Sequence, residues 1–327
     1  MRVRVRGPGE LVAALPALLG YHARRSIVMV VLGRASLRIR LTLRLDIPTD
    51  ADDADTRRAV AESLVCGASR VDGDQAMLVV LDGDDDLAAA LSAQVRGLLE
   101  ADGRMLVDTV VVRDGRYRSV ECTDPECCPA TGRPVPQSSA LVAAAISEGT
   151  VIHADRAALA AEVSAPDDAD ADRSRRVAAL LASTLAHGSV ELDEDGIEAL
   201  LDRGCADAAE GRLGLDDAVR LAMVLGIGEI RDQAYVHMLT VGAQSHRVLW
   251  GSVCRQVHAE IAAAPLALAA LAAYLGGAGT LATAAIERAR VIDADHASVS
   301  LVNDILRAGI PPSVVRDALT RSVLDDR

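Results

Sequence analysis

Strand patterns occur before about residue 163 of this chain and not beyond it, and this change constrains the fold more than any other feature. Before it, residues 27–32 are apolar throughout and residues 37–45 alternate strictly between apolar and polar. The first pattern is typical of a central strand and the second of a half-exposed strand paired with it in a hairpin. Beyond residue 173, apolar residues recur with the helical period of 3.6 in every segment.

These patterns predict a two-domain protein. We expect an α/β domain with a mixed sheet and hairpins over residues 1–163, an Asp-rich linker over 164–172, and an all-helical domain over 173–327. One of the predicted helices runs from 245 to 263. The residues from Ala282 to Ala294 approximate the second half of a tetratricopeptide repeat, so a tetratricopeptide-like array, a helical bundle or another short helical array fits the second domain.

Composition limits the chemistry that the chain can perform. Its 327 residues include no Phe, one Trp and four Tyr, so Leu, Val, Ile and Ala must fill the core. All 34 basic residues are Arg. Mechanisms that depend on a lysine, such as a Schiff base or a Walker-type phosphate site, are therefore excluded.

Charge is distributed unevenly, which bears on the partners of the chain. The net charge is −13, but residues 1–45 carry nine Arg against Glu10 alone, including Arg2, Arg4 and Arg6. Side chains on the polar face of the alternating strand, Arg38, Arg40 and Arg44, form either an anion-binding surface or an ordinary solvated face. Because the whole chain is acidic and poor in aromatic residues, we predict no nucleic-acid partner and expect a protein partner to bind the helical domain.

No segment is predicted to cross a membrane. The longest apolar stretch, residues 261–275, is rich in Ala and contains Pro265, and Glu10 and Pro16 interrupt the apolar stretch near the N-terminus. We expect a cytoplasmic protein whose thiols are reduced.

Three of the six cysteines lie within seven positions, in the segment Cys122-Thr-Asp-Pro-Glu-Cys127-Cys128-Pro. Such a turn could hold a metal ion, exchange a disulfide, or simply pack its thiols. As a metal site it would use Cys122, Cys127 and Cys128, with zinc as the cofactor. A fourth ligand is then required, from Asp124, His22, His153 or water. Adjacent cysteines are expected to share one ion only with backbone strain.

A second hypothesis makes the chain an enzyme. His22, Ser26 and Asp46 are the candidate catalytic residues, and a hydrolase or transferase would need His22, Asp46 and the cysteine segment around one pocket. Each residue also has a structural interpretation: His22 caps the preceding helix, Ser26 forms a turn, and Asp46 marks a strand end. The acidic residues 82–86 similarly suit either Mg²⁺ or the start of a helix.

The histidines of the helical half show no spacing typical of a site. They are His187, His237, His246, His258 and His296. Cys205 and Cys254 are interpreted as small buried hydrophobic residues, and Trp250 as core.

Several motifs resemble an actinobacterial family defined as a domain of unknown function. They are Leu18-Leu-Gly-Tyr-His22, a form of L-L-G-[FY]-H; Arg44-Leu-Asp-Ile-Pro48; and the cysteine segment, a form of C-x-D-P-x-C-C-P. The resemblance spans nearly the whole chain and implies a family and a fold, not an activity. The residues above favour a non-catalytic interaction or sensing protein with a metal- or redox-responsive cysteine loop.

Overall fold

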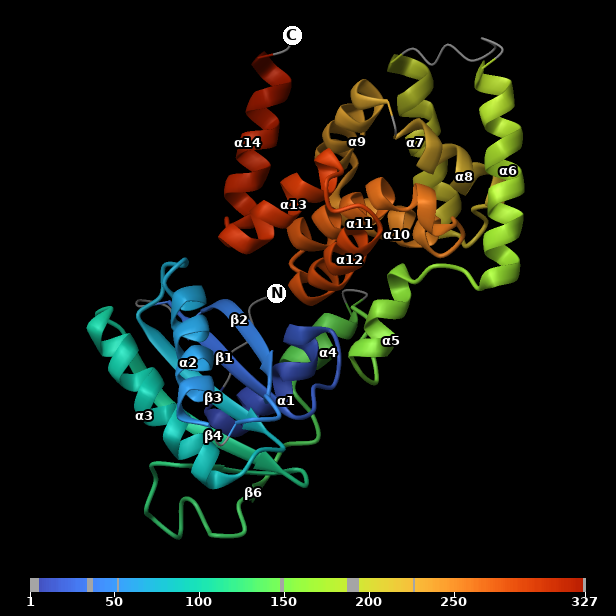
Figure 1. The fold of residues 1–327 in the computed structure, drawn as a ribbon. Coiled ribbons are helices and arrows are strands. Elements are labelled where there is room, and N and C mark those ends of the chain that lie inside the picture. Colours follow the sequence, from blue (N-terminus) through green and yellow to red (C-terminus); the bar gives the residue numbers. More distant parts are fainter. Residues whose placement is uncertain are drawn as a thin grey trace. The chain divides into compact units, whose positions relative to one another are not determined.

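The computed structural model describes residues 6–33, 38–51, 53–147, 150–186, 194–225 and 227–325. The chain divides into two compact units, Met1–Arg156 and Ala157–Arg327. The first is built on a sheet and the second consists of helices (Figure 1), which confirms the predicted fold class. Arg2, Arg4 and His187, named above, lie outside the described residues.

The first unit contains one described sheet of six strands in the order β2-β1-β3-β4-β5-β6. Its elements are α1 (Pro8–Leu19), β1 (Ser26–Leu32), β2 (Ile39–Asp46), α2 (Ala54–Ala68), β3 (Gln75–Leu81), α3 (Asp85–Ala101), β4 (Met105–Arg113), β5 (Arg116–Ser119), β6 (Arg133–Pro134) and α4 (Ala140–Ser147). Strands β3 and β4 are parallel and α3 connects them, whereas the other described neighbours are antiparallel. The sheet is therefore mixed, with the predicted hairpin between β1 and β2.

Strand β1 is buried on both faces, as its continuous apolar run predicts. Ile27, Met29 and Val31 pack in one core with residues of α2 and α3, while Val28 and Val30 on the opposite face are also inaccessible to solvent. Burial on both sides removes most of the apolar surface of the strand from water, which is the main favourable contribution to its stability. The central strands thus form a fixed platform from which the loops at either end project.

Short-range polar chemistry fixes the ends of these elements. Asp114 and Gly115 both have positive φ, 51° and 69°, as the two-residue turn between β4 and β5 requires. Within the acidic residues 82–86, the carboxylate of Asp84 accepts a hydrogen bond from the backbone N–H of Leu87 at 2.7 Å and so caps α3. Asp85 forms an ion pair with Arg118. Of the two interpretations given for residues 82–86, the start of a helix therefore applies to Asp84.

The Asp84 cap gives a first prediction. Asp84→Ala removes the acceptor from the first turn of α3, and we expect the free energy of unfolding to fall by about 1 kcal/mol. Urea denaturation followed by circular dichroism measures the loss. Asp86→Ala, an exposed change in the same helical turn that leaves the cap intact, is the matched control. Equal losses in the two variants would show that the cap contributes nothing beyond its charge.

The second unit is helical in all its described elements. They are α5 (Arg156–Ala160, beginning at the unit boundary), η1 (Ala161–Val163), α6 (Asp168–Ala186), α7 (Glu194–Ala209), α8 (Leu215–Val224), α9 (Gly228–Val241), α10 (Ala243–Cys254), η2 (Ala259–Ile261), α11 (Ala263–Leu275), α12 (Gly279–Ile292), α13 (Ala297–Ala308) and α14 (Pro312–Asp325). Helix α11 is the centre of this unit, with nearly every residue buried, and it packs against α10, α12 and α13. Trp250 of α10 is fully buried, as predicted.

One predicted helix is wrong. The segment 245–263 is two elements, because α10 ends at Cys254 and the short helix η2 begins at Ala259. The physical reason is a side chain from α6: the hydroxyl of Ser174 accepts the backbone N–H of His258 at 3.0 Å and also bonds its ring Nδ1 at 2.8 Å. These two bonds hold His258 in an extended conformation and interrupt the helix.

The domain boundaries and the tetratricopeptide likeness stay predictions. Residues 168–172 of the expected linker form the first turns of α6, and the two compact units divide between Arg156 and Ala157. No helix among the described residues is both long and apolar enough to cross a membrane.

Candidate metal centre

The cysteine loop connects β5 to β6 at one end of the sheet, and its first anchor is Ser119. The hydroxyl of Ser119 accepts the backbone N–H groups of Glu121 and Cys122, each at 3.2 Å, and donates to the carboxylate of Asp108 at 2.6 Å. Burial raises the pKa of Asp108, and the Ser119 hydrogen bond opposes that effect. The start of the loop is thus tied to the sheet beside Cys122.

Asp124 folds the loop back on itself. Its backbone carbonyl accepts the N–H of Cys128 at 2.7 Å, and its carboxylate accepts the N–H of Glu126 at 2.9 Å. This side-chain bond is an Asx turn, which Asp adopts readily. Because the carbonyl bond spans four residues, it returns Cys128 to the neighbourhood of Cys122.

Two arginines hold the other side of the loop. The guanidinium of Arg133 donates to the carbonyl of Glu126 at 3.0 Å, and that of Arg116 donates to the carbonyls of Thr131 and Gly132 at 2.7 Å each. Gly132 has φ +69°, and a Cβ there would lie 3.0 Å from the carbonyl oxygen of Tyr117. The loop therefore needs a glycine at this position and has a defined path back to β6.

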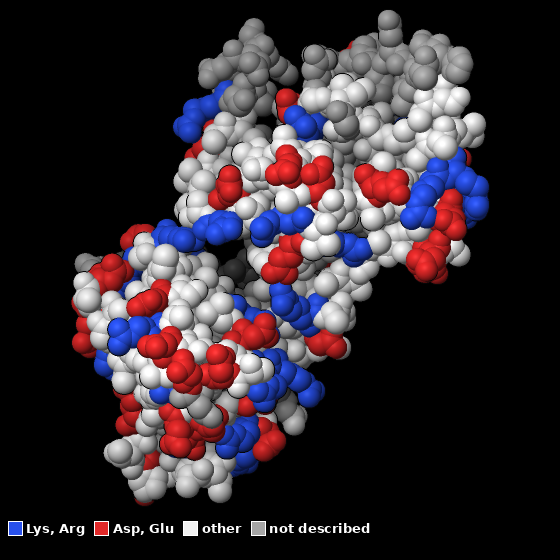
Figure 2. All heavy atoms as spheres, viewed as in Figure 1, with Lys and Arg blue, Asp and Glu red and all other residues white. Residues whose placement is uncertain are grey.

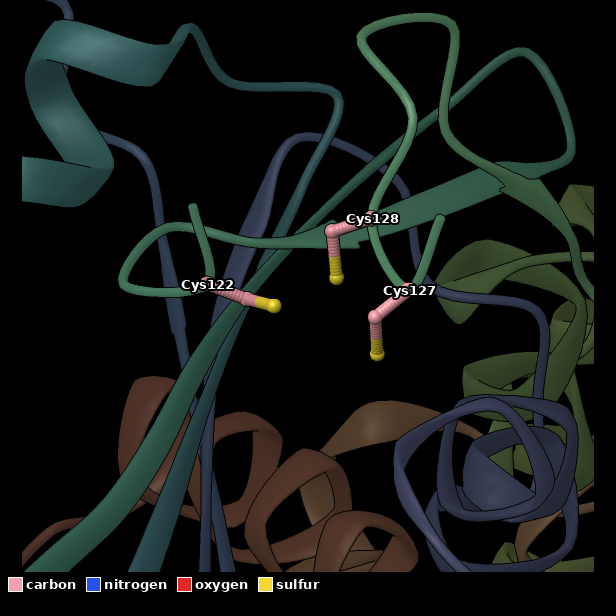
Figure 3. A group of neighbouring side chains, drawn as sticks. All are labelled: Cys122, Cys127 and Cys128. Atoms are coloured by element: carbon pink, nitrogen blue, oxygen red, sulfur yellow. The ribbon is translucent and has the colours of Figure 1, made fainter. Parts of the chain in front are cut away.

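The result is a cluster of three thiols. The sulfur atoms of Cys122, Cys127 and Cys128 all lie within 4.8 Å of one another. Figure 3 shows the three side chains converging on one space, Cys122 from one arm of the loop and the adjacent cysteines from the other. Cys127 is exposed and the other two are half-exposed, and all three are free cysteines.

The structure bears on two expectations about this loop, and the identity of the metal ligands stays a prediction. Adjacent cysteines were expected to approach one point only with strain, yet the non-glycine residues with positive φ in the described chain are Arg25, Asp82 and Asp114, none of them in the loop. The converging ligand atoms are the three sulfurs. Asp124, predicted as a fourth ligand, uses a carboxylate oxygen to close the turn.

The three thiols of the cluster oppose one another's ionisation. Cys122 raises the pKa of the Cys127 thiol, first through a shared hydrogen bond and then through repulsion between thiolates, and Cys128 acts in the same direction. A thiolate is the form that binds metal, so the cluster resists ionisation until a cation offsets the repulsion.

The candidate catalytic residues lie elsewhere in the first unit. Ser26 is fully buried, donates its hydroxyl proton to the carbonyl of Arg24 at 2.6 Å, and accepts the Nε–H of Arg44 at 2.9 Å. The carboxylate of Asp46 faces Arg44 and, at 3.9 Å, Arg156. The hydroxyl of Ser26 is thus committed to structure, and Arg44 is bound rather than freely solvated.

His22 is exposed and serves the fold through its backbone. Its N–H donates to the carbonyl of His153 at 3.1 Å, beside the bridge that pairs Tyr21 with His153. Helix α1 ends at Leu19, and the next residue, Gly20, caps it with a φ of 82° and an N–H bond to the carbonyl of Pro16. The cap assigned to His22 is therefore made by Gly20.

Strand order keeps Asp46 away from the thiols. Asp46 ends β2 at one edge of the sheet, and the cysteine loop follows β5, four strand spacings away in the order β2-β1-β3-β4-β5. At about 4.8 Å per spacing the separation across the sheet is roughly 19 Å. A pocket formed by Asp46 and the cysteine loop together finds no support in this topology.

Comparison with known proteins assigns the family. The model of a domain of unknown function, DUF4192, matches residues 8–313. The chain belongs to the DUF4192 family. The match spans both units, as the resemblance implied, while the actinobacterial origin and the individual motifs stay predictions. No curated protein and no solved structure matches the chain.

The structure also contains a cluster that the sequence patterns did not indicate. Cys205, His237 and His246, all buried, place their ligand atoms within 4.8 Å of one another in the second unit of this DUF4192 member. Sequence analysis assigned them no pairing because they come from α7, α9 and α10. The sequence did contain one signal of this cluster. His246 lies one helical turn before Trp250, on a face of the helix that must be apolar.

Proposed function

We propose that this chain is a metal-responsive protein that binds one Zn²⁺ ion through the thiolates of Cys122, Cys127 and Cys128. The observation that carries the proposal is the convergence of the three sulfurs within 4.8 Å. Thiolate sulfur is a preferred ligand of zinc, and three cysteines occupy three of its four tetrahedral positions.

Distances favour a metal over a disulfide. Zn–S bonds of about 2.3 Å in tetrahedral geometry put the sulfurs about 3.8 Å apart, so sulfurs at most 4.8 Å apart need to move by about 1 Å. A disulfide needs two of them at about 2.05 Å and a specific dihedral angle, which requires a larger rearrangement of the loop. The hydrogen bonds of Asp124 and Ser119 hold the arrangement that suits the ion.

Charge in the loop also supports the assignment. Three thiolates with one Zn²⁺ carry a net charge of −1, and the guanidinium groups of Arg116 and Arg133 bind backbone carbonyls of the same loop. Since each thiol must lose its proton to bind, zinc affinity falls as the pH is lowered.

The fourth coordination position gives the site its responsive character. With Asp124 engaged in the turn, water or a side chain of another protein completes the zinc shell. The exposure of Cys127 leaves the cluster open to such a ligand.

We assign the interaction with a protein partner to the helical unit, in the cytoplasm, and we do not expect nucleic acid as a partner. Figure 2 supports the last point, since acidic and basic side chains are interspersed over the visible surface of each unit.

Elemental analysis combined with thiol counting tests the proposal. We expect full-length protein, purified under reducing conditions, to hold one zinc ion per chain. Cobalt substitution should give the intense thiolate-to-cobalt absorption and tetrahedral d–d bands of a sulfur-rich site, and these bands should be absent from Cys127→Ser. Cys66→Ser, an exposed cysteine of α2, is the control that should bind as the parent does.

Two results would overturn the proposal. Metal-free protein that takes up neither zinc nor cobalt with its thiols reduced would make the loop a turn with packed cysteines. Loss of two thiols on mild oxidation, blocked by substitution of either cysteine of the pair that forms the bond and unaffected by zinc, would assign the loop to disulfide exchange instead.

A further inference from the structure

A row of polar side chains runs from the surface of the second unit into its core. The carboxylate Oδ1 of Asp202 on α7 lies 3.1 Å from Nε2 of His237 on α9. Nδ1 of His237 lies 2.8 Å from Nε2 of His246 on α10, whose Nδ1 is 3.0 Å from the indole nitrogen of Trp250. Exposure falls along the row, from 60% for the Asp202 side chain to 5% for His237 and 0% for His246 and Trp250.

The hydrogen bonds determine where each proton lies. The indole nitrogen of Trp250 can only donate, so Nδ1 of His246 must accept. A neutral His246 then carries its proton on Nε2 and donates it to Nδ1 of His237. His237 in turn carries its proton on Nε2 and donates to Asp202. Each ring nitrogen therefore either donates or accepts one hydrogen bond. The three N–H protons, on Trp250, His246 and His237, all point along the row toward the carboxylate of Asp202.

This assignment argues against a metal ion at the same place, although Cys205 joins the two histidines in a compact cluster. The nitrogens nearest each other share one proton, so neither offers a free lone pair. Binding of a metal through Nε2 of His246 would move its proton to Nδ1, where it would meet the N–H of Trp250. Burial, and then the charge of Asp202, raise the pKa of the Cys205 thiol to about 11, which keeps it protonated.

Among the described residues, Asp202 is the charged group that hydrogen-bonds to this row. From α7 the groups that face the two rings are Asp202 and Cys205. Helix α11, packed against α10, has Tyr274 as its one ionisable residue, and that hydroxyl donates to the carbonyl of Ile310. The charged residues described on α9 and α10 and on their other neighbours are exposed or half-buried: Arg231 and Asp232 on α9, Arg247 on α10, Asp216, Asp217 and Arg220 on α8, Arg316, Asp317 and Arg321 on α14, and Glu162 on η1.

We infer that the row Asp202–His237–His246–Trp250 is an acid-sensitive latch, which holds α7, α9 and α10 together at neutral pH and releases them on protonation. A proton added to His237 must go to Nδ1, where it faces the Nε2–H of His246. If His246 shifts its own proton to Nδ1, that proton faces the indole N–H of Trp250. One added proton therefore breaks a buried hydrogen bond wherever it settles, and a buried donor left without an acceptor destabilises the unit.

The sign of the pH dependence follows from the buried ring. Burial, and then the charge of His237, lower the pKa of His246 to about 3, whereas an unfolded histidine has a pKa of about 6.5. Below about pH 6.5 the unfolded chain therefore binds a proton that the folded chain does not. Stability is fully present above that pH and is lost progressively as the pH falls toward about 3.

Trp250 is the one tryptophan of the chain, so its fluorescence reports directly on the row. We expect the full-length protein to show a lower urea midpoint at about pH 5 than at pH 7, with a red shift of the emission on opening. In His246→Gln, the amide oxygen can accept from Trp250 and the amide NH₂ can donate to His237, but the side chain does not titrate. The ratio of the urea midpoint at pH 5 to the midpoint at pH 7 should therefore rise in this variant most of the way to one.

Two control variants and a second measurement complete the test. His258 is the other buried histidine of this unit with a lowered pKa, caused mainly by burial, so His258→Gln measures its share of the pH dependence; His22→Gln, an exposed change in the other unit, should alter nothing. Nitrogen-15 spectra of the parent protein read the tautomers without a variant, and we expect Nε2–H for both His237 and His246. A His246 in the Nδ1–H form, zinc-dependent shifts of its resonances that Cys205→Ser removes, or a pH dependence unchanged in His246→Gln would overturn the latch.

Discussion

Each of the substitutions Cys122→Ser, Cys127→Ser and Cys128→Ser will lower the zinc affinity of this chain by more than about 100-fold. Loss of a residue that merely orients a ligand typically costs 10–100-fold in affinity, and loss of a ligand costs more. Serine fits the space of cysteine, yet its hydroxyl does not ionise near neutral pH and is a poor zinc ligand. Competition titrations with a zinc chelator measure the affinity of each variant.

The same variants will also change the resistance of the loop to proteases. With zinc bound, residues 120–132 are held at both ends, by Ser119 and by Arg133, and across their middle by the ion. A chelator should therefore expose this segment to cleavage in the parent protein, and the serine variants should be cleaved with or without zinc. Cys66→Ser, in α2, should retain the affinity and the protection of the parent. Three serine variants with parental affinity would leave the cluster without a role in metal binding.

How far the sequence predicts this fold depends on the range of the interactions involved. The run of residues 27–32 and the turn at Asp114-Gly115 are local patterns, and both produce the expected strand and hairpin. The helix predicted over 245–263 fails because its break comes from Ser174, 84 residues away in the sequence. Periodicity within a segment contains no information about such a contact.

The same distinction between local patterns and distant contacts applies to the candidate site. The cysteine segment was recognisable because its three thiols are close in sequence, and a turn of a few residues suffices to bring them together. For Ser26 the sequence offered a catalytic and a turn-forming interpretation, and it contained no sign of the hydrogen bond from Arg44, 18 residues away. The row from Asp202 to Trp250 needed three helices in their packed positions. Only the packed unit assigns the protons of His237 and His246.

Arg104 shows how much of the first unit depends on a single side chain that no sequence pattern singles out. It follows α3, after Gly103 turns the chain with a φ of 71°, and its side chain is 15% exposed. The guanidinium donates to the carbonyls of Gly73, Val71 and Ser69, the last two at 3.1 and 3.3 Å, and its Nε donates to Asp102 at 2.7 Å. One planar group thus fastens the loop before β3 to the start of β4.

Arg104→Ala will lower the free energy of unfolding of the first unit by about 3 kcal/mol. Hydrogen bonds to a charged group each contribute about 1.5–3 kcal/mol, and the carbonyls that lose their donor recover part of that through water. Arg104→Lys should recover little, because an ammonium group cannot fork to several carbonyls as a guanidinium does. Urea denaturation followed by circular dichroism measures both, with the exposed Arg58→Ala on α2 as control. If the lysine variant equals the parent in stability, the positive charge rather than the forked geometry holds this loop.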